Sequence, residues 1–140
     1  MSDRDAAMLD TDQFIIHDIS RFPLCVFRND AAAPGYAAQW ATEMAALIAH
    51  AAPFVVAFAG TPDGEAHEDR RDRAMWLKQN KAALAQVCRA LVTVDADPAR
   101  RAEAIEQGRM ATKAFGIAHE AVATLDDAAA LARRLAQAPN

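Results

Sequence analysis

The amino-acid sequence predicts an α/β fold: a single domain with a mixed, mostly parallel sheet of about five strands and helices packed on it. Two short β-rich runs come first, helical and apolar β-rich segments then alternate along the chain, and residues 53–60 form an apolar run without polar alternation. Because parallel strands need crossover connections, this alternation indicates a mostly parallel sheet with helical cover. The expected element order is ββαβαβαβα.

Length and composition are those of one ordinary domain. The chain has 140 residues, of which 53% are hydrophobic, and its net charge is −4. We expect a flexible lead over residues 1–13, the domain over 14–137 and a frayed tail over 138–140. The charge balance gives no general attraction to nucleic acid. Without a signal sequence or an apolar run of roughly 18 residues, the expected location is cytoplasmic, without membrane insertion.

The first half of the chain predicts a hairpin, a helix and a central strand. "FIIHDIS" and "FPLCVFR" are β-rich and closely spaced, so we expect an antiparallel hairpin whose second strand begins at Pro23. After the turn "NDAAAPG", a helix is predicted over residues 36–50. Its apolar stripe toward the sheet contains Trp40, Met44, Leu47, Ile48 and Ala51. Residues 53–60 are then expected in the middle of the sheet, covered on both faces.

The second half predicts two further strands, each followed by a helix. A long helix is expected over residues 65–90, followed by the strand "LVTVD". The next helix begins with Asp97 as N-cap and Pro98 at its first position, and Gly108 weakens its middle. "IAHEAVATL" is the last strand, and the last helix covers residues 126–137 behind a cap at Thr124.

Two apolar lines run along the predicted long helix. The core stripe contains Ala74, Leu77, Leu84, Cys88 and Leu91. Trp76, Ala83 and Val87 form a second line, displaced from the first by roughly 90°. Two explanations are open: the helix is buried between neighbouring helices, or the second line is an oligomeric or partner surface anchored by Trp76, a residue type enriched at interfaces.

The start of this helix is the candidate ligand site. Arg70 and Arg73 continue the core stripe toward the N-terminus, near the carboxyl end of the central strand, where open α/β sheets bind ligands. Helix amides and two arginines can hold a phosphate or a carboxylate. The alternative is a self-paired exposed helix, because Glu68 precedes Arg71 by three positions and Asp69 precedes Arg73 by four.

The sequence contains no recognisable catalytic, metal or nucleotide motif. The four histidines are scattered without HExxH spacing, and the loop "GTPDG" matches neither the phosphate-loop nor the GxGxxG pattern. Cys25 and Cys88 lie in apolar patterns without redox spacing, which predicts reduced core thiols. For His17, on an early strand, a structural role is favoured over catalysis. We therefore expect no catalytic residue, no metal and no cofactor.

The segments "WLKQNKAALAQVCRALVTVD" and "ARRAEAIEQGRMATKAFGIAHEAVATLDDAAALARRL" follow the initial hairpin in an order that resembles the STAS-like, or SpoIIAA-like, proteins. The resemblance covers the chain from about Phe14 to Leu135 and rests on element order and hydrophobic pattern. Anti-sigma-factor antagonists of that family carry a phosphorylated residue in a D[ST]S segment after the central strand. In "AFAGTPDGEAHED" only Thr61 is available for phosphorylation, without the flanking aspartate and serine of the motif.

The resemblance implies a regulatory module that acts through protein contact, and we expect it to self-associate as a homo-oligomer. Trp76 and Val87 are the expected contacts, with the loop 60–65 and the helix start 67–73 as the recognition end.

The competing hypothesis is a small-molecule site, for an anionic or apolar ligand, at the same end of the helix. There Arg70 and Arg73 would hold an anionic group, and His67, near the border of the stripe, would act as an acid or base.

Overall fold

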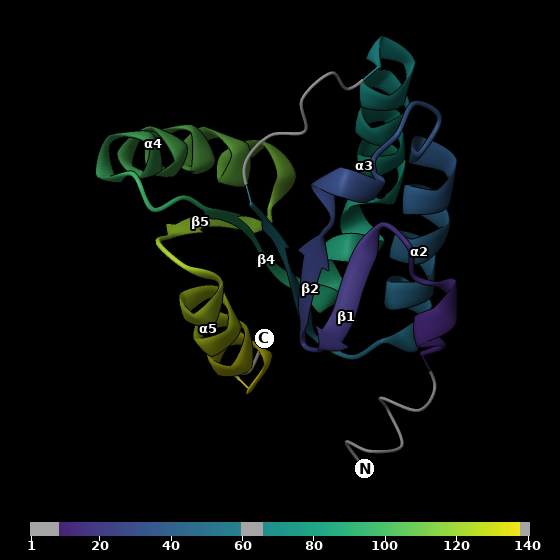
Figure 1. Cartoon of the computed structure of the whole chain (residues 1–140), viewed down its shortest axis with the longest axis horizontal. Coiled ribbons are helices and arrows are strands. Elements are labelled where there is room, and N and C mark those ends of the chain that lie inside the picture. Colours follow the sequence, from purple (N-terminus) through teal and green to yellow (C-terminus); the bar gives the residue numbers. More distant parts are fainter. Residues whose placement is uncertain (1–8, 60–65, 138–140) are drawn as a thin grey trace.

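The structure is a computed structural model that describes residues 9–59 and 66–137 (Figure 1). Its helices (α), 3-10 turns (η) and strands (β) are, in chain order, η1 (Thr11–Gln13), β1 (His17–Arg21), β2 (Leu24–Phe27), η2 (Asn29–Ala31), α2 (Ala37–His50), β3 (Phe54–Phe58), α3 (His67–Val87), β4 (Cys88–Val94), α4 (Pro98–Phe115), β5 (Ala118–Val122) and α5 (Leu125–Gln137). The predicted α/β class and the order ββαβαβαβα are confirmed.

The five strands form one mixed sheet in the order β1-β2-β3-β4-β5. β1 and β2 are antiparallel, as the hairpin prediction required, and the remaining neighbours are parallel. β3 is the third of the five strands, which confirms the predicted central strand. Pro23 lies immediately before β2 rather than within it, because β2 begins at Leu24.

The sheet has two different faces. Cys25, Val56 and Leu91 lie in register on the face covered by α2 and α3, whereas α5 covers the opposite face (Figure 1). Leu9 is also buried in the hydrophobic cluster on the face covered by α2 and α3. The lead predicted over residues 1–13 therefore overlaps the domain at residues 9–13, and residues 1–8 lie outside the described part, as does the predicted tail 138–140.

The long helix is shorter than predicted, because α3 ends at Val87 and β4 starts at Cys88 without an intervening loop. Cys88 and Leu91, assigned to a helical stripe from the sequence, are therefore strand residues. Leu84 of the predicted stripe is fully buried, but Ala74 is exposed, so the stripe prediction is wrong at that position. When a helical periodicity is extended past the end of the helix into a strand, it assigns the strand residues to the wrong face.

One residue of the second apolar line of the long helix, Trp76, packs against α2. The Trp76 ring meets the Trp40 ring edge to face, with 5.2 Å between the ring centroids. Trp76 and Val87 are partly buried and pack on the core cluster of this face, whereas Ala83 is exposed. Contact with Trp40 of α2 and with the core therefore buries most of Trp76, and the core cluster partly buries Val87.

Helix α4 lies along the outer edge of β5 rather than over the sheet. Asp95 N–H donates to the Val122 carbonyl, so the backbone of Val122 faces β4 and, by alternation, that of His119 faces away from β4. The N–H of His119 donates to Thr112 Oγ1 of α4 (3.0 Å), and this hydroxyl donates to the Gly108 carbonyl (2.7 Å). A helix that covers an edge strand in this way prevents further strand pairing there.

Gly108 permits this close approach. A Cβ atom added to Gly108 would lie 3.1 Å from both the Cβ and the carbonyl oxygen of His119. From the sequence, Gly108 was interpreted only as a weak point in the helix. The structure shows that the close contact with His119 requires a residue without a side chain there.

Replacing Gly108 with Ala is therefore expected to gain none of the stability that alanine usually gives in a helix, about 1 kcal/mol. The matched measurement is Ala102→Gly at an exposed position of the same helix, which we expect to lose that amount. Both free energies of unfolding are measured by urea denaturation. A gain of about 1 kcal/mol in Gly108→Ala would show that α4 does not depend on this contact.

Candidate functional site

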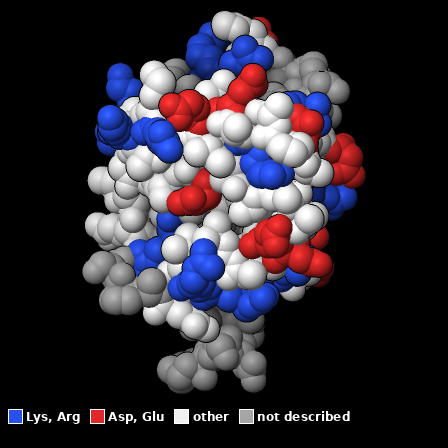
Figure 2. Space-filling view, turned by 90° about the vertical axis from the view of Figure 1, so that its left-hand side faces the viewer, with Lys and Arg blue, Asp and Glu red and all other residues white. Residues whose placement is uncertain are grey.

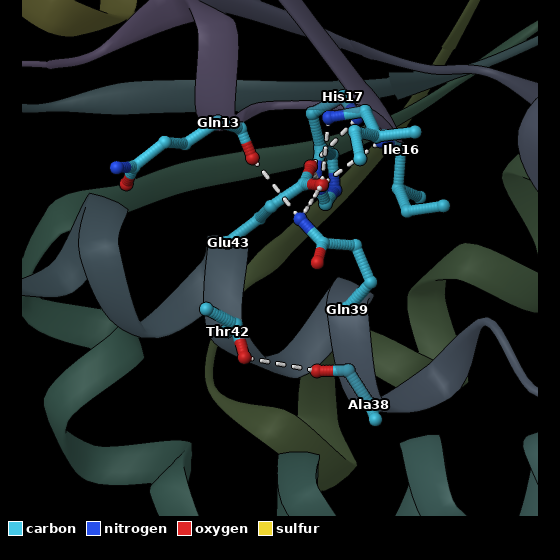
Figure 3. Close-up of polar contacts among 8 residues, drawn as sticks. Gln13, Ile16, His17, Ala38, Gln39, Thr42 and Glu43 are labelled. Atoms are coloured by element: carbon cyan, nitrogen blue, oxygen red, sulfur yellow. Dashed lines mark hydrogen bonds and ion pairs between the residues drawn. The ribbon is translucent and has the colours of Figure 1, made fainter.

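The first polar cluster is a buried carboxylate on α2. Glu43 Oε2 accepts the backbone N–H groups of Ile15 (2.8 Å) and Ile16 (2.9 Å) and the side-chain amide of Gln39 (2.8 Å). Glu43 Oε1 accepts the N–H of His17 and its ring Nδ1, both at 2.8 Å (Figure 3). These hydrogen bonds join the start of β1 to α2. His17 takes part in them, which agrees with the structural role favoured from the sequence.

The hydrogen bonds keep Glu43 ionised. Burial raises the pKa of Glu43, but the hydrogen bonds from His17, Ile16, Gln39 and Ile15 outweigh burial and lower this pKa from 4.5 to about 2. A carboxylate whose two oxygens already accept five hydrogen bonds is not available as a general base. Sequence reasoning missed Glu43, although a glutamate beside Met44 in the apolar stripe of a helix was a usable signal.

The lowered pKa of Glu43 predicts acid sensitivity. Because this pKa is lower in the folded state, the stabilisation is complete above about pH 4.5 and is lost as the pH falls toward 2. The expected contribution is at most about 3 kcal/mol. Urea denaturation at several pH values should show a steeper acid loss of stability in the wild type than in Glu43→Gln, and equal slopes would contradict this account.

The second buried carboxylate joins α3 to the start of α2. Asp69, in the first turn of α3, accepts the N–H of Gly35 (2.8 Å) and of Ala37 (3.1 Å). Tyr36, at the N-cap position of α2, makes no side-chain cap of its own. Asp69 therefore caps α2 from a neighbouring helix, which fixes the start of α3, including Arg73, relative to α2.

The structure does not bring all the predicted site residues together. His67 and Arg70 are exposed on the first turn of α3. Arg73 is half-buried, and its guanidinium carbon lies 5.8 Å from the centre of the Trp40 ring. Trp76, three residues later on α3, also contacts the Trp40 ring. Arg73 and Trp76 therefore both contact the Trp40 ring. Thr61 and the remainder of the loop 60–65 lie outside the described residues, and Val87 lies at the far end of α3.

A groove of about 320 Å³ lies between α3 and α4. Because α4 is at the sheet edge, the face of β4 and β5 between the two helices stays open to solvent. The groove is lined by Phe58, Arg73, Leu77, Leu91, Thr93, Ala104, Gln107, Gly108, Ala111, His119 and Glu120. An apolar recess of about 60 Å³ shares Leu77, Leu91 and His119 with it and reaches Leu84, Phe115 and Ile117.

The two ends of the groove differ in polarity. Arg73 of α3 and Thr93 of β4 lie toward the carboxyl ends of the strands, Gln107 lies in the middle of α4 beside Gly108, and Phe115 lines the recess at the other end. At that end Lys81 Nζ of α3 donates to the Ala114 carbonyl of α4 (3.2 Å), which joins the two helices. A molecule in the groove therefore meets Arg73 and Thr93 toward one end, and mostly apolar side chains together with Lys81 toward the other.

His119 lines both the groove and the recess, and a hydrogen bond fixes the orientation of its ring. Its Nδ1 lies 2.8 Å from the Ile117 carbonyl oxygen, which can only accept, so Nδ1 carries the proton. In the neutral ring Nε2 is therefore the acceptor nitrogen. No role was predicted for His119, because the groove forms only when α4 lies at the sheet edge.

The two cysteine thiols lie in the core, away from the groove. Cys25 and Cys88 are free and buried in the core, as predicted, and burial raises the pKa of both thiols, that of Cys88 to about 12. Within residues 9–59 and 66–137, no group of three or more His, Cys, Asp or Glu side chains can hold a metal ion. In the same ranges no helix has the length and apolar character to cross a membrane.

The side of the molecule formed by α4, β5 and α5 has no dominant charge. Figure 2 shows basic and acidic side chains interspersed there with uncharged surface. Part of this mixture comes from pairs such as Arg109 with Glu106 on α4 (3.1 Å). The visible described residues on this side thus lack the continuous basic surface that phosphate backbones require.

Comparison of the chain with protein-family models, with curated proteins and with solved structures gave no match. The STAS-like resemblance therefore stays a prediction, and the functional argument depends on the geometry of the groove.

Proposed function

We propose that this protein is a binding module that holds a small molecule in the groove between α3 and α4. The observation that carries the proposal is the position of α4 at the edge of β5, which leaves an open groove with Leu91 on its floor and Leu77 of α3 on its wall. Burial of apolar surface favours binding by about 25 cal/mol per Å² before the entropic cost of association is subtracted. The polar end of the groove lies toward the carboxyl ends of the parallel strands, where α/β proteins usually bind ligands.

This site retains part of the small-molecule hypothesis from the sequence. Arg73 lines the groove, whereas His67 and Arg70 are exposed on the turn before it. The resemblance to STAS-like proteins supports a binding role, because members of that family are associated with protein partners or apolar ligands. Two free, buried cysteines are in keeping with a reducing compartment such as the cytoplasm.

The test uses phenylnaphthylamine, a neutral probe whose fluorescence rises in apolar sites. Ala111→Trp is designed to fill the groove from α4, and Ala130→Trp adds the same side chain at an exposed position of α5 on the opposite face of the sheet. We expect the wild type and Ala130→Trp to bind the probe with equal affinity and Ala111→Trp to lose binding at least tenfold. Equal binding by all three proteins, or no binding by the wild type, would refute the groove as the site.

A second candidate function is self-association through protein contact. Met75 of α3 and Met110 of α4 are 51% and 74% exposed, and each offers an apolar side chain to a partner. The predicted contacts Trp76 and Val87 contribute only the part of their surface that their own chain leaves open. Native mass spectrometry distinguishes the candidates: a dimer that Met110→Gln converts to monomer favours contact, whereas a monomer with a retained small molecule favours the groove.

A further inference from the structure

We infer that the ligand of the groove is a neutral apolar molecule with a hydroxyl group, and that Nε2 of His119 accepts a hydrogen bond from this hydroxyl. The inference rests on the proposed function and adds the chemical class of the ligand and the residue that selects it. It follows from the position of the His119 ring and from the nitrogen that carries its proton.

The His119 side chain lies on the groove side of the sheet. His119 pairs in register with Leu91, and directly paired residues of neighbouring strands direct their side chains to the same face. Leu91 packs on the core cluster under α2 and α3, so the His119 ring is on this face as well. The ring lines both the groove and the recess, and its centroid lies 6.4 Å from that of the Phe115 ring. A molecule that occupies the recess therefore contacts His119.

The two ring nitrogens of His119 have different roles. Nδ1 donates to the Ile117 carbonyl oxygen (2.8 Å), so in the neutral ring Nε2 carries the lone pair. The nitrogens of an imidazole ring point away from each other, so Nε2 is directed away from Ile117. No residue in the described part of the chain donates a hydrogen bond to Nε2. This nitrogen is therefore an acceptor that a ligand can use.

The ring of His119 is held in place before any ligand binds. The backbone N–H of His119 donates to Thr112 Oγ1 of α4 (3.0 Å), and the Cβ atom of His119 lies close to Gly108 of the same helix. Together with the hydrogen bond from Nδ1, these contacts fix both the backbone and the ring. Binding of a ligand to Nε2 therefore costs little side-chain entropy.

The surroundings of Nε2 in the recess favour a ligand that brings its own donor. Lys81 lines the recess, but an ammonium group can only donate, and it donates to the Ala114 carbonyl (3.2 Å). An apolar molecule without a donor would displace water from Nε2 and leave this nitrogen unpaired, whereas a hydroxyl replaces the water. The other residues that line the recess are apolar: Leu77, Leu84, Leu91, Phe115 and Ile117.

The other acceptors of the groove lie outside the recess. Thr93 and Gln107 line the groove but not the recess. Glu120 pairs in register with Val92, whose side chain packs on the α5 side, so the Glu120 carboxylate is directed to that opposite face. A ligand donor bound at Thr93 or Gln107 would not depend on His119, so a variant of His119 distinguishes these positions.

The test compares naphthol with its methyl ether, methoxynaphthalene, which keeps the rings and lacks the donor. Displacement of phenylnaphthylamine gives the two dissociation constants, and their ratio is the preference for the hydroxyl. We expect this preference to be about fivefold larger in the wild type than in His119→Phe, since a neutral hydrogen bond contributes about that factor in affinity. Comparing the ratio between variants cancels the difference in hydrophobicity between the two compounds.

His67→Phe is the matched control, because His67 is an exposed histidine at the start of α3. It should keep the preference of the wild type. Equal preferences in the wild type and His119→Phe, or an equal loss in His67→Phe, would overturn His119 as the acceptor while the groove remained a site.

A measurement on the wild type keeps the inference testable if His119→Phe misfolds. The nuclear magnetic resonance signal of His119 Nε2 should shift when naphthol binds and should shift much less when methoxynaphthalene binds. Equal shifts with the two compounds would overturn the hydroxyl class of ligand. Naphthol binding that Ala111→Trp does not reduce would instead refute the proposed function itself.

Discussion

Replacing Glu43 with Gln is expected to lower the free energy of unfolding by about 3 kcal/mol or more. If the new amide nitrogen replaces Oε2, it faces the donors of Ile15, Ile16 and Gln39, and if it replaces Oε1, it faces the N–H of His17. In either orientation a buried N–H loses its acceptor, and the remaining hydrogen bonds lose the charge of the carboxylate. Both effects destabilise the folded state.

The measurement is urea denaturation of Glu43→Gln followed by tryptophan fluorescence. Glu103→Gln, at an exposed position of α4, is the control and should change stability by less than about 0.5 kcal/mol. A loss below about 1 kcal/mol in Glu43→Gln would mean that the start of β1 does not depend on the carboxylate.

Replacing Asp69 with Ala is expected to cost about 2 to 3 kcal/mol. The change leaves the N–H groups of Gly35 and Ala37 without an acceptor at the start of α2 and removes the link between α2 and α3. The loss of stability at an ordinary exposed cap is smaller, but Asp69 is only 3% exposed. Arg73, one turn later on α3, should also lose its fixed position over Trp40.

Asp72→Ala is the matched control for Asp69, because Asp72 is an exposed acid on the same turn whose pair with Arg71 is 3.7 Å long. It should cost less than about 0.5 kcal/mol. Both variants are measured by thermal and urea denaturation. Similar small losses of stability in the two variants would contradict the capping role of Asp69. They would favour the alternative from the sequence, in which the start of the helix is exposed and pairs its own charges.

The fold was predictable because its signals are local. The apolar run of β3, the cap formed by Asp97 and Pro98, and the stripe of α2 each depend on residues close together in the chain. The end of α3 was mispredicted because Val87 and Cys88 continue an apolar pattern that both a helix and a strand can use. No turn residue separates the two elements there.

The site was predictable only in part. The sequence placed Arg73 near the carboxyl end of the central strand, and Arg73 does line the groove. His119 and Thr93 were missed because their position depends on α4 lying at the edge of β5, a contact permitted by Gly108 across a sequence distance of 11 residues. Asp69 was interpreted within its own helix, whereas its partners, Gly35 and Ala37, lie more than 30 positions earlier.

The most direct test of the groove is a nuclear magnetic resonance titration of the wild-type protein with phenylnaphthylamine, in which backbone amide shifts are followed. The account predicts that the largest shift changes occur at Leu91, Thr93, Ala111 and His119 on the floor and wall of the groove. Amides on the exposed side of α5, such as that of Ala130, should stay unchanged. Changes centred on α5, or on Met75 and Met110 alone, would contradict the groove as the binding site.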